Sequence, residues 1–234
     1  MYQAVFFDID NTLLLKKPSI QEKVFETAIR HIPGLNFEAV ERAYAASEIW
    51  QGEQIRQENE TGIRMPDDEY LTHVVKIYCD SLNLSAAVGD ELTDIFSRGY
   101  KKSYHLVPGA MEVLTQLKAR GLLLGVVSNN YAGIRQVLEE QGIAHFFAPI
   151  IISEEVNLYK PDPEILKLAC AQAGVSTNDC VYVGDHPFDI LCAHKAHMDA
   201  VWMPVNQFIK VPEYIGAPEH TVSALNELLD IIKF

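Results

Sequence analysis

The stretch that decides the fold is Ala4-Val5-Phe6-Phe7-Asp8-Ile9-Asp10-Asn11-Thr12, near the N-terminus. Its first four residues form a continuous apolar run, which is typical of a parallel strand buried on both faces. In open α/β sheets, ligands bind just beyond the carboxyl ends of such strands, where Asp8 and Asp10 fall. Alternate residues of an extended segment point the same way, so both carboxylates can face one small ligand. Because buried charge is unfavourable, the stretch predicts a site whose chemistry needs these carboxylates.

The spacing of Asp8 and Asp10 also predicts a metal ion. Two ionised carboxylates about 4 Å apart repel each other by roughly 4 kcal/mol at an effective dielectric constant near 20. A hard divalent cation removes this repulsion, and Mg2+ takes carboxylate oxygens as ligands. We therefore expect one bound Mg2+ at the end of this strand.

Length and composition indicate the class of protein. The 234 residues suffice for one large domain, or for a core domain and a smaller one. The net charge of −13 disfavours binding to nucleic acid and to anionic membrane surfaces. No apolar run of about 18 residues could span a bilayer, and no basic segment followed by an apolar one begins the chain. We expect a cytoplasmic monomer or homodimer that acts on a small molecule, with four free cysteines.

The segment from residue 17 to residue 100 has a helical period and no convincing strand. Ser19 and Asn36 precede the first two apolar stripes and are expected N-caps. Beyond Trp50 the apolar stripe of the second helix is lost in a polar stretch. The four expected helices cover residues 20–32, 37–50, 67–82 and 85–96.

From about residue 105 onward, short apolar runs alternate with helical patterns, which is typical of βαβ units. Besides residues 4–7, the expected strands cover 122–127, 149–152, 180–183 and 200–203. The expected helices cover residues 110–120, 133–141, 163–173, 190–197 and 222–232. The sequence therefore predicts an α/β protein: a Rossmann-like parallel-sheet core of residues 1–16 and 101–234, with an inserted helical cap of residues 17–100.

Polar groups follow four of the expected strands. They are Asp8 and Asp10 after the first, Ser128, Asn129 and Asn130 after the second, Lys160 beyond the third, and Asp185 and Asp189 after the fourth. Because the carboxyl ends of parallel strands meet at one edge of the sheet, we expect these groups to lie together. They supply a carboxylate nucleophile, a second carboxyl, a hydroxyl, a cation and further metal ligands. That combination suits phosphoryl transfer.

These four motifs resemble those of the haloacid dehalogenase superfamily, and the helical insertion is similar to the cap of its first subfamily. The resemblance covers the whole core. It implies a Mg2+-dependent phosphatase that hydrolyses a small phosphate monoester through an aspartyl-phosphate intermediate. Sugar phosphates, nucleotides and phosphoglycolate remain open as substrates.

The resemblance also implies a role for each motif residue. Asp8 would attack phosphorus, and Asp10 would protonate the leaving oxygen and later activate water. Thr12 would stabilise the loop after the strand. Ser128 and the backbone N–H of Asn129 would bind a phosphoryl oxygen. These are the expected groups around the transferred phosphoryl group.

The same resemblance assigns the charged groups that surround the nucleophile. Lys160 would offset negative charge on both the phosphate and Asp8. Asp8, the backbone carbonyl of Asp10 and Asp185 would bind Mg2+. Asp189 would either support the metal ligands or orient the lysine.

Each motif has a simpler interpretation when taken alone. Asp-x-Asp occurs in turns, Ser128 could cap a helix, and Lys160 could be a surface residue. The order of the four motifs favours the catalytic interpretation. The dehalogenases proper lack a carboxyl at the position of Asp10, since a halide leaving group needs no proton, so dehalogenation is disfavoured. A phosphomutase and a non-catalytic binding protein remain the alternatives.

A cap of this kind closes over the site and contacts the part of the substrate beyond the phosphate. Trp50, Arg56 and Arg64, near the polar break, are candidate specificity residues. The alternative is that they serve only packing and surface solvation.

Overall fold

Strand β1 (Ala4–Phe7) lies inside a parallel sheet in the computed structural model, which describes residues 2–232. Its neighbours are β4 (Leu123–Ser128) and β6 (Cys180–Gly184), and all four of its residues are buried. This explains the continuous apolar run, because a central strand covered on both faces has no solvent side. The last residue, Phe7, pairs with Val126 and Val183, so the three strands end near one another.

The sheet has six strands in the order β5-β4-β1-β6-β7-β8. The outer strands are β5 (Ile150–Ile152), β7 (Asp199–Trp202) and β8 (His220–Thr221). Every pair in this sheet is parallel, which confirms the predicted Rossmann-like α/β fold.

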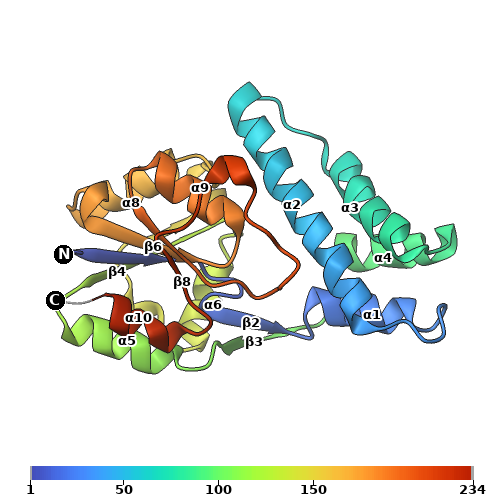
Figure 1. The fold of residues 1–234 in the computed structure, drawn as a ribbon, viewed down its shortest axis with the longest axis horizontal. Coiled ribbons are helices and arrows are strands. Elements are labelled where there is room, and N and C mark those ends of the chain that lie inside the picture. The colour runs from blue at the N-terminus through green and yellow to red at the C-terminus, as the bar shows by residue number, and fades with distance from the viewer. Residues whose placement is uncertain (1, 233–234) are drawn as a thin grey trace. The chain divides into compact units, whose positions relative to one another are not determined.

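Helices cover both faces of the sheet (Figure 1). On one face, α8 (Glu164–Ala173) and α9 (Pro187–Lys195) pack against Phe6 and its neighbours. On the other face, α5 (Ala110–Ala119), α6 (Ile134–Glu140) and α10 (Leu228–Ile231) pack against Phe7 and its neighbours. A further helical turn, α7 (Ser153–Val156), follows β5 directly. The layers bury β1 and leave the carboxyl ends of the strands for polar residues.

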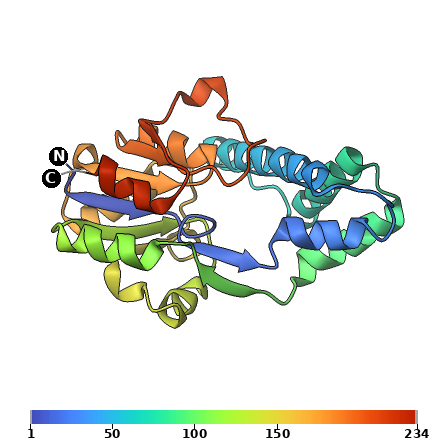
Figure 2. The same cartoon turned by 60° about the horizontal axis from the view of Figure 1, so that its bottom comes forward.

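The chain divides into two compact units. The first comprises the described residues up to 15, 104–205 and those from 210 onward. The second comprises residues 16–103 and 206–209 and contains four helices (Figure 2). They are α1 (Ile20–Ala28), α2 (Phe37–Thr61), α3 (Asp67–Leu82) and α4 (Ala86–Arg98).

Helix α2 continues to Thr61, so the prediction that it ends near Trp50 is wrong. Polar pairs one turn apart replace the lost apolar stripe, including Gln54 with Glu58 at 3.1 Å. The helix ends where Gly62 adopts φ 70° and donates its N–H to the Glu58 carbonyl. Its start agrees with the prediction, since Asn36 is the N-cap.

A two-stranded sheet was missed at the ends of the helical segment. Strand β2 (Leu14–Lys17) pairs with β3 (Ser103–Leu106) where the chain enters and leaves that segment. Both strands are only partly buried and too short for a clear alternating pattern, which is why the sequence did not reveal them. The Ser103 hydroxyl donates to the Lys17 carbonyl at 3.2 Å.

The C-terminal segment also differs from the prediction. A helix was expected over 222–232, but only α10 is α-helical, and a 3-10 turn (Leu225–Glu227) precedes it. The buried residues Val222, Leu225 and Leu228 have helical spacing although Ala224 is extended, so the period alone was misleading. Strand β8, which was not among the expected strands, forms the edge of the sheet just before this segment.

Residues 206–209 pack with the N-terminal part of α2. Asn206 is buried, and its Nδ2 donates to the Glu41 carbonyl at 2.9 Å. The Arg42 guanidinium lies 4.0 Å from the centroid of the Phe208 ring. These contacts explain why the short segment belongs to the helical unit. No helix within residues 2–232 is both long and apolar enough to cross a lipid bilayer.

Candidate active site

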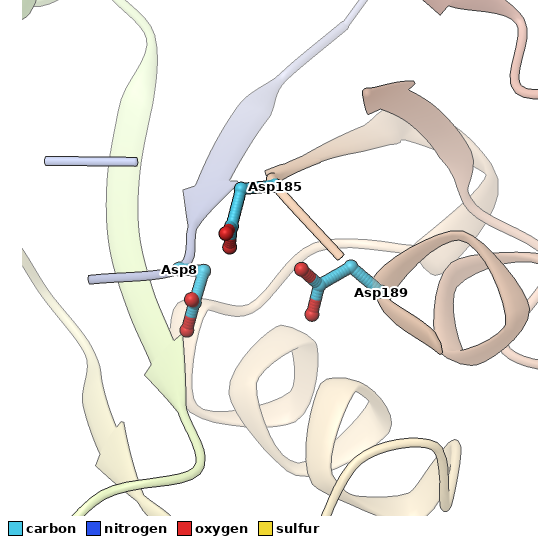
Figure 3. Close-up of side chains that lie close together, drawn as sticks. All are labelled: Asp8, Asp185 and Asp189. Carbon is cyan, nitrogen blue, oxygen red and sulfur yellow. The ribbon is translucent and has the colours of Figure 1, made fainter. Parts of the chain in front are cut away.

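Three buried carboxylates meet at the ends of β1 and β6. Asp8 follows β1 directly, and its N–H donates to the Val183 carbonyl at 2.9 Å. Asp8, Asp185 and Asp189 each offer an oxygen within 4.8 Å of the other two. Figure 3 shows the three side chains close together, with Asp189 coming from helix α9. The sequence prediction that these groups lie at one edge of the sheet agrees with this geometry.

Lys160 is the positive charge of the cluster. It is 6% exposed, and its Nζ donates to Asp8 Oδ1 at 2.9 Å, Asp189 Oδ1 at 2.6 Å and the Tyr182 hydroxyl at 2.8 Å. Burial lowers the pKa of this amine, but the carboxylates of Asp189 and Asp8 outweigh burial and hold the pKa well above its ordinary value. Lys160 is therefore a cation at neutral pH.

The charge on Asp8 depends on Lys160. Burial raises the pKa of Asp8, the ammonium of Lys160 opposes that rise, and the Asp189 carboxylate adds to it. The net direction is upward. A nucleophile must be ionised, so Asp8 needs positive charge beside it to act at neutral pH.

Asp189 uses both carboxylate oxygens within the protein. Its Oδ1 accepts from Lys160, and its Oδ2 accepts from the His186 N–H at 3.0 Å at the start of α9. The carboxylate is thereby fixed by the helix that carries it. This geometry corresponds to the second of its two expected roles, orientation of the lysine.

Gly184 leaves the space that the Asp189 carboxylate fills, because a Cβ at residue 184 would overlap that carboxylate. We expect Gly184→Ala to displace Asp189, to lower the free energy of unfolding by about 1–3 kcal/mol and to reduce turnover. Chemical denaturation and steady-state kinetics measure the two effects. Gly89→Ala is the control, since its Cβ would meet only side chains of the helical unit. Equal turnover in the two variants would contradict the prediction.

Asparagine side chains hold two of the aspartates. Asn11 Nδ2 donates to Asp185 Oδ2 at 3.1 Å, and Asn130 Nδ2 donates to Asp10 Oδ2 at 3.2 Å. Asn11 adopts φ 58°, a left-handed conformation that asparagine tolerates better than most residues. The carboxylate of Asp10 is therefore oriented from the end of β4, separately from the cluster around Lys160.

The residues at the end of β4 contact both the nucleophile and the lysine. Ser128 is buried, and its side chain hydrogen-bonds the Asp8 carboxylate. The Asn129 side chain pairs with the backbone of Lys160: Nδ2 donates to the carbonyl at 2.9 Å, and Oδ1 accepts the N–H at 2.8 Å. Asn129 was expected to act only through its own N–H. The two hydrogen bonds from its side chain to the backbone of Lys160 were not predicted.

Thr12 lies in the turn after β1 and is fully buried. Its backbone N–H donates to the Ile9 carbonyl at 3.3 Å. Its Oγ1 makes no hydrogen bond with another residue in the described part of the chain. The contribution of Thr12 to the loop is therefore through its backbone and its burial.

The donor set suits a hard divalent cation. Three buried carboxyl groups face one another here, and among the described residues Lys160 is the cation that contacts them, so the cluster offers more acidic groups than this one ammonium balances. Carboxylate oxygens are the ligands that Mg2+ prefers in proteins. Asp8 and Asp185 are the better candidates, because Asp189 is already bound to Lys160 and His186.

Two of the candidate specificity residues, Trp50 and Arg56, contact other residues of the helical unit. Trp50 stacks on His73, with ring centroids 5.3 Å apart. Arg56 donates to Glu60 at 2.6 Å within α2, and Arg64 is exposed beyond the helix. Packing and surface pairing account for the contacts of Trp50 and Arg56.

Tyr182 was missed as a member of the site. The sequence did contain a sign of its role, because Tyr182 is a hydroxyl-bearing residue in an otherwise apolar strand, three residues before Asp185. Tyrosine is common in strands for its packing, so the sequence alone gave no reason to single it out.

Comparison with known proteins identifies the family of this chain. A family model for haloacid dehalogenase-like hydrolases matches residues 2–197. Phosphoserine phosphatase of Thermus thermophilus is 33% identical over 140 residues, which are 59% of this chain and 55% of that protein. Glyceraldehyde 3-phosphate phosphatase of Methanopyrus kandleri is 30% identical over 240 residues, covering 100% of this chain and 98% of that protein. The crystal structure of the L-2-haloacid dehalogenase RSc1362 has a TM-score of 0.68 at 23% identity, covering 98% of each chain.

Proposed function

Because this chain belongs to the haloacid dehalogenase-like hydrolase family, we propose that it is a Mg2+-dependent phosphatase that hydrolyses a small phosphate monoester. The observation that carries the proposal is the buried Lys160 ammonium, 2.9 Å from Asp8 Oδ1. A carboxylate can approach a phosphate dianion only where positive charge is already present. Residues 17–100 are proposed as the cap domain of this enzyme.

Asp8 is the proposed nucleophile. One of its carboxylate oxygens attacks phosphorus, the bond from phosphorus to the ester oxygen breaks, and an aspartyl phosphate forms. Lys160 favours the ionised form of Asp8 and offsets part of the charge that develops on the phosphoryl oxygens. Ser128 and the backbone N–H of Asn129 are the proposed donors to those oxygens.

Asp10 is the proposed acid and base. It gives a proton to the leaving alcohol oxygen and later accepts one from the water that hydrolyses the aspartyl phosphate. The bond from Asn130 to Asp10 supports this role by orienting the carboxylate. A halide leaving group would need no such acid, so Asp10 favours the phosphatase over a dehalogenase.

Asp8 and Asp185, with the Asp10 backbone carbonyl, are the proposed ligands of Mg2+, and Asp189 supports them through Lys160. When bound, the ion supplies positive charge for the phosphoryl oxygens. The matched relatives act, by their names, on phosphoserine and glyceraldehyde 3-phosphate, which are both small monoesters. Substrates of that class, together with sugar phosphates, nucleotides and phosphoglycolate, form the panel to test.

Mg2+ is expected to stabilise the fold, because it removes repulsion among buried carboxylates. At a hundredfold excess over the dissociation constant the gain is about 2.7 kcal/mol. Thermal denaturation with Mg2+ and with a chelator measures it. Asp185→Asn should abolish most of the gain, whereas Asp90→Asn on the exposed surface of α4 should retain it. A melting temperature unaffected by saturating Mg2+ would count against the metal site.

Release of inorganic phosphate from the substrate panel, with Mg2+ and with a chelator, tests the proposed function. Turnover that needs the metal and Asp8 would support it and would rank the substrates. Conversion of a sugar phosphate into an isomer without phosphate release would replace it by a phosphomutase. No reaction with any panel member, together with no effect of Mg2+ on the melting temperature, would overturn it.

A further inference from the structure

Tyr182 of β6 carries a buried hydroxyl that the proposed function does not use. The residue is 1% exposed, between the apolar Val181 and Val183. Burying a hydroxyl is unfavourable unless it is hydrogen-bonded, so its partners indicate its role. Within the described residues these are the Lys160 Nζ at 2.8 Å and the Val127 carbonyl oxygen at 2.6 Å.

The first partner gives Tyr182 a defined place around Lys160. A protonated lysine has three N–H donors and no acceptor. Asp8 and Asp189 take two of these donors, and the Tyr182 oxygen takes the third. Three acceptors fix the rotation of the ammonium as well as its position. A phosphoryl oxygen could then bond Lys160 only by sharing or displacing one of them.

The second partner fixes the direction of the Tyr182 hydroxyl. A phenol has one proton, and here it is donated to the carbonyl of Val127, the residue before Ser128. In the sheet order β4-β1-β6, the Tyr182 side chain reaches across β1 to make this bond. The oxygen therefore turns its lone pairs to Lys160, and the phenol cannot rotate without losing the bond to β4.

The hydroxyl is also a neutral acceptor. Burial raises the pKa of Tyr182 well above its ordinary value, so the phenol keeps its proton. Because the third acceptor is neutral, the positive charge of Lys160 is balanced only by the carboxyl groups of Asp8 and Asp189 among its three acceptors. A carboxylate in its position would bring a third negative charge to a cation that two carboxylates already share.

We infer that Tyr182 is a positioning residue for phosphoryl transfer: it holds the third N–H of Lys160 and thereby keeps the ammonium on the nucleophile Asp8. The inference rests on the proposed function, because that function makes Asp8 the attacking group. Tyr182 touches no reacting atom and acts through Lys160. Loss of its hydroxyl therefore changes the rate of the chemical step more than the affinity for substrate.

Tyr182→Phe removes only the hydroxyl, and Tyr78→Phe makes the same change in a residue that is equally buried in α3. We expect Tyr182→Phe to lower kcat at least tenfold, roughly the value of one hydrogen bond to a charged group, with KM within about twofold. Tyr78→Phe should leave both constants within about twofold of wild type. If kcat is the same in the two variants, the inference is overturned.

Nuclear magnetic resonance of protein labelled with 15N at lysine gives a readout that needs no turnover. In the wild type we expect the Lys160 ammonium protons to exchange slowly, because all three are bonded. Their exchange with solvent should be faster in Tyr182→Phe, and its rate should be unchanged in Tyr78→Phe. An unchanged Lys160 signal in Tyr182→Phe would overturn the inference, even if the protein hydrolysed every ester in the panel.

The wild type alone supplies a further check if Tyr182→Phe does not fold. Its Tyr182 hydroxyl proton should exchange slowly and show a nuclear Overhauser effect to the Lys160 side chain. Absence of that protected proton would overturn the inference. The protein could instead hydrolyse no ester although the Tyr182 hydroxyl and the Lys160 ammonium are both protected from exchange. That result would confirm the contact between the two residues and contradict the proposed function.

Discussion

Asp8→Asn is expected to lower the rate of phosphate release at least a thousandfold, about the scale seen when a catalytic nucleophile is removed. The amide has nearly the same size as the carboxylate but cannot form an acyl phosphate. The variant should still fold. Burial raises the pKa of Asp8, which means that a negative charge is unfavourable at this position, and the neutral amide carries none. The measurements are kcat at saturating substrate and the melting temperature without metal.

The matched control for this variant is Asp90→Asn, which makes the same chemical change on the exposed surface of α4. Its kcat should equal that of the wild type. If Asp8→Asn also retains wild-type turnover, the nucleophile lies elsewhere in the chain.

Lys160→Met is expected to lower the free energy of unfolding by about 3–5 kcal/mol. Methionine fills a similar volume, but it leaves Asp8 and Asp189 buried without the cation they share. Chemical denaturation measures the loss. Lys76→Met is the control, because Lys76 pairs with Asp80 on the exposed surface, where such pairs contribute little to stability. If Lys160→Met lowers the free energy of unfolding no more than Lys76→Met does, the ion pairs of Lys160 with Asp8 and Asp189 contribute little to stability.

The loss in Lys160→Met should depend on pH. The pKa of Lys160 is raised, so its contribution is fully present below its unfolded value of about 10.4 and disappears as the pH rises through the folded value. In the variant, Asp8 lacks the ammonium that opposed the rise of its pKa. The folded variant therefore takes up a proton on Asp8 at a higher pH than the wild type does, and its deficit shrinks as the pH falls. A deficit independent of pH would contradict this account.

The sheet could be predicted because each buried strand has a complete local signal. Residues 4–7 are apolar on both faces, and the groups that follow are polar, as a central parallel strand requires. The local sequence pattern did not predict the strands that depend on pairing with residues far away along the chain. Strand β2 exists through pairing with β3, about 90 residues away along the chain, and β8 through pairing with β7.

The charged residues of the site could be predicted from chemistry, but the side-chain contacts that their neutral partners make could not. A carboxylate or a lysine after a buried strand is unexpected unless it has a function, so Asp8 and Lys160 stood out. Asn129 and Tyr182 are ordinary residues for a loop and a strand. Their contacts with Lys160 depend on how three strands lie side by side, which no local pattern contains.

The covalent state of Asp8 during turnover decides whether this residue is the nucleophile. The measurement is mass spectrometry of the peptide containing Asp8, after rapid acid quenching of the enzyme with the best ester of the panel. We expect a phosphoryl group on Asp8 in the wild type, more of it in Asp10→Asn, and none in Asp8→Asn. Phosphate release with Asp8 unmodified in all three proteins, or with the phosphoryl group on another residue, would contradict it.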